Sequence, residues 1–163
     1  MYSSVAYYYE HPTPMRQVDA LDVGDPRGEA EHDYRAVPAT SVEQRVAQFE
    51  GVDDAVGVSD SGRAVAETSH FSLKVNGPDE GTTSGLRLRR LYDQAAIQEA
   101  EVWVNGARAG VWYSPTTNTS KRWAEADFII PLELLDGRPV VDIEIRVVTG
   151  PWSEYRYELW AIP

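Results

Sequence analysis

EAEVWVNGARAGVWY, residues 99–113, holds the clearest structural signal in the chain. At its centre Asn105 and Gly106 separate two apolar runs and predict a β-hairpin, because both central residues of a type I′ turn need a positive φ. Pairing the strands outward from this turn gives an apolar face with Val104 opposite Ala107, Val102 opposite Ala109 and Ala100 opposite Val111. The other face carries Trp103 opposite Arg108, together with Glu99, Glu101, Gly110 and Trp112. The hairpin therefore predicts a core face and an aromatic, charged face suited to a sugar ring.

The rest of the chain after residue 67 alternates apolar and polar residues in short segments that end at turn signals. The longest alternation lies at 140–149, where the residues expected to face inward are Val141, Ile143, Ile145 and Val147. Short strands separated by regularly spaced turns predict an all-β fold. We expect an antiparallel β-sandwich of the jelly-roll type, with one short helix.

The first third of the chain is less regular. Residues 2–10 predict a strand that ends before two prolines, and 17–21 predict a short strand. Residues 22–33 combine two glycines and a proline with several acids, which is typical of a linker. We therefore divide the chain into 1–33, an N-terminal strand and acidic linker, and 34–163, the β-sandwich domain.

The one helix is expected at 41–51. Ser41 and Gln44 match a capping box, and Val42, Val46 and Phe49 follow at helical spacing.

Composition excludes several classes of function. The 163 residues carry a formal net charge of −11, which argues against a nucleic-acid partner. No apolar run is long enough to span a membrane, and no signal peptide is apparent. The absence of cysteine fits a reducing compartment, so we expect a cytoplasmic protein. The three histidines share no metal-ligand spacing and no phosphate loop is present, so the sequence predicts neither a metal nor a cofactor.

Glycoside hydrolysis needs two carboxyl groups that face one sugar bond. Among the 26 acids, Glu10 and Asp93 stand out because they lie beside aromatic residues or arginines. The favoured interpretation of both is structural, with Glu10 at a strand end and Asp93 as the ion-pair partner of Arg89 or Arg90.

Residues 86–94, LRLRRLYDQ, place several arginines on one predicted strand. Arginines there either clamp a ligand or form a surface ladder with Asp142, Glu144 or Glu101, and the ladder is favoured. Trp103, Trp112 and Trp123 likewise either stack on a sugar or fill the core. The candidate substrate-binding residues are Trp103, Arg108, Trp112, Tyr113, Arg89, Arg90 and Asp93.

Four segments resemble the C-terminal region of glycoside hydrolase family 172, also known as DUF2961. They are LRLRRLYDQ (86–94), AEVWVNG (100–106), GVWY (110–113) and FIIP (128–131). Residues 2–9 resemble the strand that closes the family's catalytic half. The resemblance implies a jelly roll, assembly into trimers or higher homo-oligomers, and action on furanosides such as α-D-fructofuranosides or D-arabinofuranosides.

This chain departs from the family at the catalytic glutamates, which lie N-terminal to the matched region. Nothing here matches the family's Gly-Thr-Gly-x-Glu-Asp-Tyr-like stretch, so no catalytic residue is carried over. Our leading hypothesis is therefore a β-sandwich that acts as oligomeric scaffold or carbohydrate-contacting domain.

Two alternatives stay open. One is a free-standing carbohydrate-binding module that contacts sugars through Trp103, Trp112 and Tyr113. The other is a small glycoside hydrolase that uses Glu10 or Asp93 and completes its site between subunits.

Overall fold

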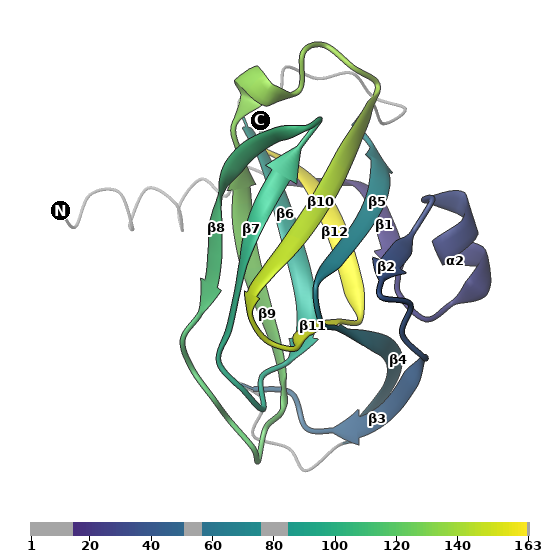
Figure 1. Ribbon diagram of the computed structural model, residues 1–163, viewed down its shortest axis with the longest axis vertical. Helices are drawn as coiled ribbons and strands as arrows, with labels where there is room; N and C mark the ends of the chain where they lie inside the picture. Colours follow the sequence, from purple (N-terminus) through teal and green to yellow (C-terminus); the bar gives the residue numbers. More distant parts are fainter. Residues whose placement is uncertain (1–14, 51–56, 76–84, 163) are drawn as a thin grey trace, which may run out of the picture.

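The computed structural model describes residues 15–50, 57–75 and 85–162. Two antiparallel sheets pack face to face, and a small third sheet lies at one end (Figure 1). The four-stranded sheet has the order β1 (Arg16–Asp22), β12 (Arg156–Ile162), β6 (Gly85–Asp93) and β9 (Trp123–Ile130). The five-stranded sheet has the order β2 (Arg35–Val37), β5 (Thr68–Lys74), β10 (Val140–Thr149), β7 (Gln98–Val104) and β8 (Ala107–Ser114). The small sheet has the order β11 (Trp152–Glu154), β4 (Val58–Val65) and β3 (Glu43–Ala47).

The connections between the two large sheets follow a jelly roll. The chain passes from β1 to β5 in the opposite sheet and back to β6, and β7 and β8 then form a hairpin. It returns to the four-stranded sheet at β9, crosses to β10 and finishes in β12 between β1 and β6. The antiparallel jelly-roll sandwich predicted from the sequence is confirmed.

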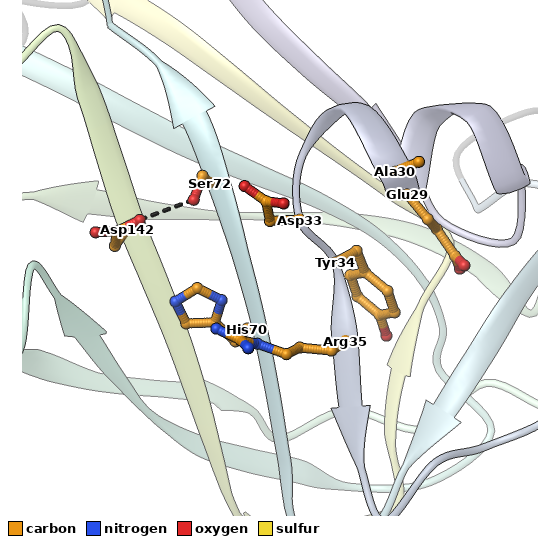
Figure 2. A pocket seen from close by; sticks show the side chains of 8 residues that line it. All are labelled: Glu29, Ala30, Asp33, Tyr34, Arg35, His70, Ser72 and Asp142. Atoms are coloured by element: carbon orange, nitrogen blue, oxygen red, sulfur yellow. Dashed lines mark hydrogen bonds between the residues drawn. The ribbon is translucent and has the colours of Figure 1, made fainter.

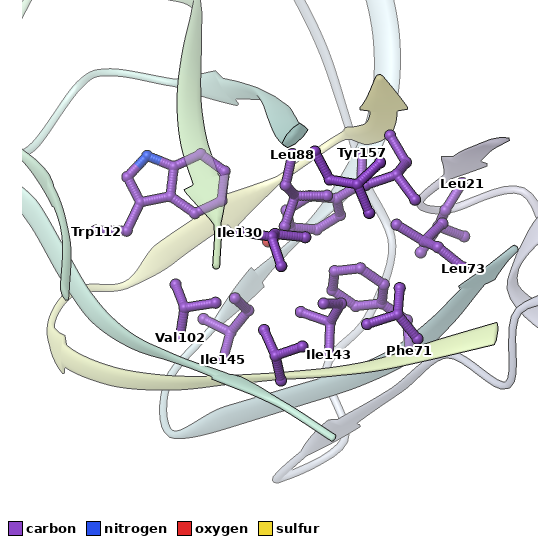
Figure 3. Packing of buried hydrophobic residues seen from close by; sticks show 14 of the residues in the cluster. Leu21, Phe71, Leu73, Leu88, Val102, Trp112, Ile130, Ile143, Ile145 and Tyr157 are labelled. Carbon is purple, nitrogen blue, oxygen red and sulfur yellow. The ribbon is translucent and has the colours of Figure 1, made fainter. Parts of the chain in front are cut away.

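The core lies between the two large sheets and is filled by every second residue of their strands (Figure 3). Of the predicted inward residues in β10, Val141, Ile143 and Ile145 are completely buried, and Val147 is partly buried against the core. In β6, Leu86 and Leu88 occupy the facing side. The period-two alternation seen in the sequence therefore determines which face of each strand is buried.

The hairpin at Asn105 and Gly106 is confirmed, with φ values of 50° and 82°. Next to the turn, Trp103 lies opposite Arg108 as predicted, but the register then shifts by one residue. This β-bulge places Val102 opposite Gly110 and Ala100 opposite Trp112, so the predicted pairing of these positions is wrong. The shift brings the side chain of Trp112 into the core.

The N-terminal part of the described chain differs from the prediction in one respect and agrees in another. The short strand expected at 17–21 is present as β1, which pairs with β12 although it lies before the expected domain boundary. The expected linker contains the helix α2 (Pro26–Glu31). Asp25 caps this helix by accepting a hydrogen bond from the Gly28 N–H at 2.7 Å, and Pro26 occupies its first turn.

The helix predicted at 41–51 is wrong, because this region forms β3, which pairs with β4. Burial in β3 alternates with period two: Glu43, Arg45 and Ala47 are half-buried. Val46 is 69% exposed, so the helical spacing of valines does not correspond to a buried face.

Residues 2–10, including the candidate acid Glu10, lie outside the described residues. A short 3-10 helix, η1 (Leu132–Leu134), precedes β10. Within the described ranges, no helix has the length and apolar character needed to cross a membrane.

Candidate functional site

The outer face of the five-stranded sheet carries an unbroken row of polar and aromatic side chains. Strand pairing aligns Arg35 with His70, His70 with Glu144, Glu144 with Trp103, and Trp103 with Arg108. Cross-strand partners point to the same side of a sheet, and their sequence neighbours, such as Val102 and Ile143, fill the core. The row therefore crosses all five strands on the face turned away from the core.

A groove of about 570 Å³ opens at the β2 edge of this face (Figure 2). We call it the outer-sheet groove and define it by Asp33, Arg35, His70, Ser72 and Asp142. Its remaining lining comes from Glu29, Ala30 and Tyr34, at the end of α2 and in the turn that follows. The turn places Asp33 at a φ of 51°. In Figure 2, Asp142, Ser72 and Asp33 lie along one side of the groove, with His70 and Arg35 on the other.

Several side chains of the groove have no partner among the described residues. Those of Asp33, Arg35 and His70 make no hydrogen bond or ion pair with other residues in the part of the chain that the structure describes. Asp142 accepts a hydrogen bond from the Ser72 hydroxyl at 2.7 Å through one carboxylate oxygen. The groove thus presents donors and acceptors together, and neither kind is neutralised by the other.

By contrast, Glu29 and Tyr34 in the lining of the groove are hydrogen-bonded within the protein. Arg63 donates to both carboxylate oxygens of Glu29, at 2.6 and 2.8 Å. The Gly24 N–H also donates to the Glu29 carboxylate, at 2.9 Å. The Tyr34 hydroxyl donates to the buried Glu154 at 2.6 Å. Glu29 and Tyr34 therefore hold α2 and the following turn against the sheet.

Trp103 lies farther along the same row, in the middle of a charged cluster. Its indole N–H donates to Glu101 at 3.2 Å, and Glu101 also accepts from Arg108 at 2.8 Å. The guanidinium carbon of Arg146 lies 3.8 Å from the centre of the indole ring. Tyr113 is 54% exposed on this face, since its strand partner is Glu99. The fold therefore brings three predicted site residues, Trp103, Arg108 and Tyr113, to one surface.

Two other predicted site residues, Trp112 and Arg90, lie in the core, where a ligand on the outer face does not reach them. Trp112 is 3% exposed, and its ring centre lies 5.7 Å from that of Trp152. Arg90 is fully buried, with its guanidinium carbon 3.3 Å from the centre of Trp152, and it donates to Gln98 and Ser114 at 3.0 Å. Burial lowers the pKa of Arg90 to about 10. Trp123 is also completely buried. Trp112 and Trp123 therefore fill the core, which was one of the two interpretations of these tryptophans.

Arg89 lies on the outer face of the four-stranded sheet, opposite to the groove. It donates to Asp127 at 2.8 Å and lies 3.1 Å from Glu125, both on the neighbouring strand β9. The favoured ladder is present, but the acids proposed as its partners, Asp142, Glu144 and Glu101, belong to the other sheet.

Asp93 is an ion-pair partner, but the arginines predicted to bind it are wrong. It is 6% exposed and accepts from Arg122 at 2.9 and 2.5 Å, while Arg45 lies 2.7 Å away. Alternation along β6 turns Arg89 outward and Arg90 into the core, so neither reaches the end of the strand. Asp93 consequently joins β6 to β3 and to the start of β9.

Sequence reasoning missed the outer-sheet groove, because its residues come from three separate segments that only the fold brings together. The signal that was available is the outward alternation of Ser72 and Asp142 on predicted strands. Among the described residues, no group of three or more His, Cys, Asp or Glu side chains is arranged to hold a metal ion.

Comparison with known proteins finds no matching family model and no matching curated protein. Among solved structures, the chain is similar to a family 35 carbohydrate-binding module from Clostridium thermocellum, with 13% identity over 77% of this chain and 95% of that one, and a TM-score of 0.45. It is also similar to the C-terminal CBM6 of the laminarinase LamC from Zobellia galactanivorans, with 10% identity over 77% and 96% of the two chains and a TM-score of 0.44.

A third similar structure is the Stig cyclase Fisc from Fischerella sp. TAU, with 8% identity over 91% and 99% of the two chains and a TM-score of 0.46. The jelly-roll assignment stands on the strand pairing of this chain.

Proposed function

We propose that this chain is a carbohydrate-contacting β-sandwich that binds a sugar on the outer face of its five-stranded sheet. The observation that carries the proposal is the outer-sheet groove, where the donors Arg35 and His70 and the acceptors Asp33 and Asp142 lie together. A sugar hydroxyl both donates and accepts hydrogen bonds, so a polyol matches this mixed set. A purely anionic or purely cationic ligand would meet groups of its own sign.

Trp103 extends the proposed surface beyond the groove. It lies two strands from His70, and with strands spaced about 4.8 Å apart this is roughly 10 Å. A ligand that contacts both residues is therefore longer than one sugar ring. The indole supplies the apolar surface on which a ring can stack, and the groove supplies the polar contacts that orient its hydroxyls.

The sequence resemblance to glycoside hydrolase family 172 supports furanosides as the first sugars to test and a homo-oligomer as the assembly. The absence of cysteine supports a reducing, cytoplasmic compartment. These three points belong to the proposal together with the sugar-binding surface.

The test is calorimetric titration of the purified chain with arabinofuranobiose, inulobiose and cellobiose. We expect at least one of them to bind, and Arg35→Gln to weaken that binding by about 10- to 100-fold, as for the loss of a charged hydrogen bond. Arg89→Gln, on the outer face of the opposite sheet, is the matched control and should leave affinity unchanged. Equal effects of the two substitutions, or no binding by the unmodified chain, would contradict the proposal.

A second candidate function follows from one observation: the carboxylates of Asp33 and Asp142 line the same groove. Two carboxyl groups across a glycosidic bond are the minimal machinery of a glycosidase. Incubation with aryl furanosides separates the two functions. A sugar-contacting domain gives no turnover, whereas hydrolysis that Asp33→Asn and Asp142→Asn both abolish would assign an enzyme.

A further inference from the structure

The indole of Trp103 has a neighbour on one of its faces. The guanidinium carbon of Arg146 lies 3.8 Å from the ring centre, which is van der Waals contact between a planar cation and an aromatic face. Arg146 is on β10, and its cross-strand partner on β7 is Glu101, two residues before Trp103. The two side chains therefore meet diagonally across adjacent strands on the outer face.

Arg146 is held in this position from its other side. Glu144, two residues earlier on the same strand, accepts from Arg146 at 2.8 and 3.3 Å. The Arg146 side chain is still 43% exposed, so it is not locked into the core.

We propose that Arg146 occupies the place of a sugar ring on Trp103 and thereby sets how tightly this surface binds neutral sugars. The inference rests on the proposed carbohydrate contact. A guanidinium and the C–H face of a sugar both use the flat face of an aromatic ring, so only one of them can occupy a given face. A neutral sugar that stacks there must displace Arg146.

The cost of that displacement is the cation–π contact. Because Arg146 keeps Glu144 as its ion-pair partner, no charge is left unpaired when the guanidinium leaves the ring. An exposed cation–π contact is worth enough to change a dissociation constant about two- to fivefold. Arg146 thus limits the affinity for neutral sugars by competition and needs no direct contact with the sugar.

The experiment compares the full chain with Arg146→Ala by calorimetric titration with arabinofuranobiose and cellobiose, both of which are neutral. Arg146→Ala is expected to bind about two- to fivefold more tightly. Arg89→Ala removes an ion-paired arginine from the outer face of the opposite sheet and should have no effect. Thermal unfolding of each variant verifies that the fold is retained.

A double-mutant cycle with Trp103→Ala identifies the mechanism. If Arg146 competes for the indole, its removal brings no gain once the indole is absent. Unchanged or weaker binding by Arg146→Ala, or a gain that persists in the Trp103→Ala background, would overturn the inference. In that event binding that still depends on Arg35 leaves the proposed function standing, whereas absence of binding by every variant removes both.

Discussion

The buried carboxyl of Glu154 is expected to make the free energy of unfolding depend on pH. It is completely buried and accepts hydrogen bonds from the hydroxyls of Ser69, Tyr34 and Tyr157 at 2.5, 2.6 and 2.8 Å. Burial is the largest influence on this carboxyl and raises its pKa above the ordinary value of 4.5, although the three donors act in the opposite direction. In the folded chain the carboxyl therefore keeps its proton to a higher pH than in the unfolded chain.

The sign of the resulting pH dependence follows from proton linkage. Below pH 4.5 both states of the chain carry the proton, and above it the unfolded chain loses the proton first. The free energy of unfolding therefore falls as pH rises from 4.5 through the folded-state pKa. Relative to Glu154→Gln, which has no proton to lose, we expect the natural chain to lose stability over this interval.

Urea unfolding of both chains at a series of pH values measures this difference. Glu125→Gln, at an exposed position on β9, is the control for replacing a carboxyl group. A difference between the natural chain and Glu154→Gln that is constant with pH would show that the buried carboxyl does not titrate in this way.

Among the elements, the hairpin of β7 and β8 is where sequence reasoning was strongest and where its limit is clearest. The turn was predictable because only a few residue types accept two successive positive φ values. The bulge was not predicted, although Gly110 inside a strand pattern is a recognised signal for one. Gly110 packs against Phe128, such that an added Cβ would lie 3.3 Å from its ring, and this tertiary contact is invisible in the local pattern.

The turn allows a direct test of backbone strain. Gly106 has a φ of 82°, and a Cβ added there would meet no atom within 4 Å. Gly106→Ala should therefore destabilise the chain by about 1–2 kcal/mol through backbone conformation alone. Gly85→Ala is the matched control, since its added Cβ makes ordinary contact with Ile162 and its φ is not positive. Equal unfolding free energies for the two variants would contradict the strained-turn account.

Tertiary contacts that the local sequence does not show also explain why residues 41–51 and Arg90 differ from the predictions. The valines of 41–51 satisfy a helical spacing, yet pairing with β4 makes the segment a strand whose half-buried residues alternate. Arg90 was assigned to a sugar site because it is charged, whereas its position in the alternation of β6 places it in the core. In both cases the interpretation of the local sequence gave the wrong surroundings for the side chains, because strand pairing determines which face of each segment is buried.

At the scale of the whole molecule, the proposed surface exists only because strands distant in sequence are neighbours. Arg35, His70 and Trp103 belong to β2, β5 and β7, and β10 lies between the last two. No single segment carries the site, so the sequence could predict Trp103 and Arg108 from the hairpin but not the groove beside α2. The fold thus places the aromatic side chain of Trp103 and the polar outer-sheet groove along a single row of cross-strand partners.

This arrangement predicts that ligand length matters. His70 and Trp103 lie roughly 10 Å apart, so arabinofuranobiose can contact both the groove and the indole, whereas methyl arabinofuranoside reaches only one. Of these two arabinofuranosides, we expect the disaccharide to bind more tightly in calorimetric titration. Trp103→Ala should remove most of that advantage, because it deletes the more distant contact, while Arg35→Gln should weaken both ligands. Equal affinities for the two ligands would mean that binding is confined to one contact and that the row does not act as a continuous surface.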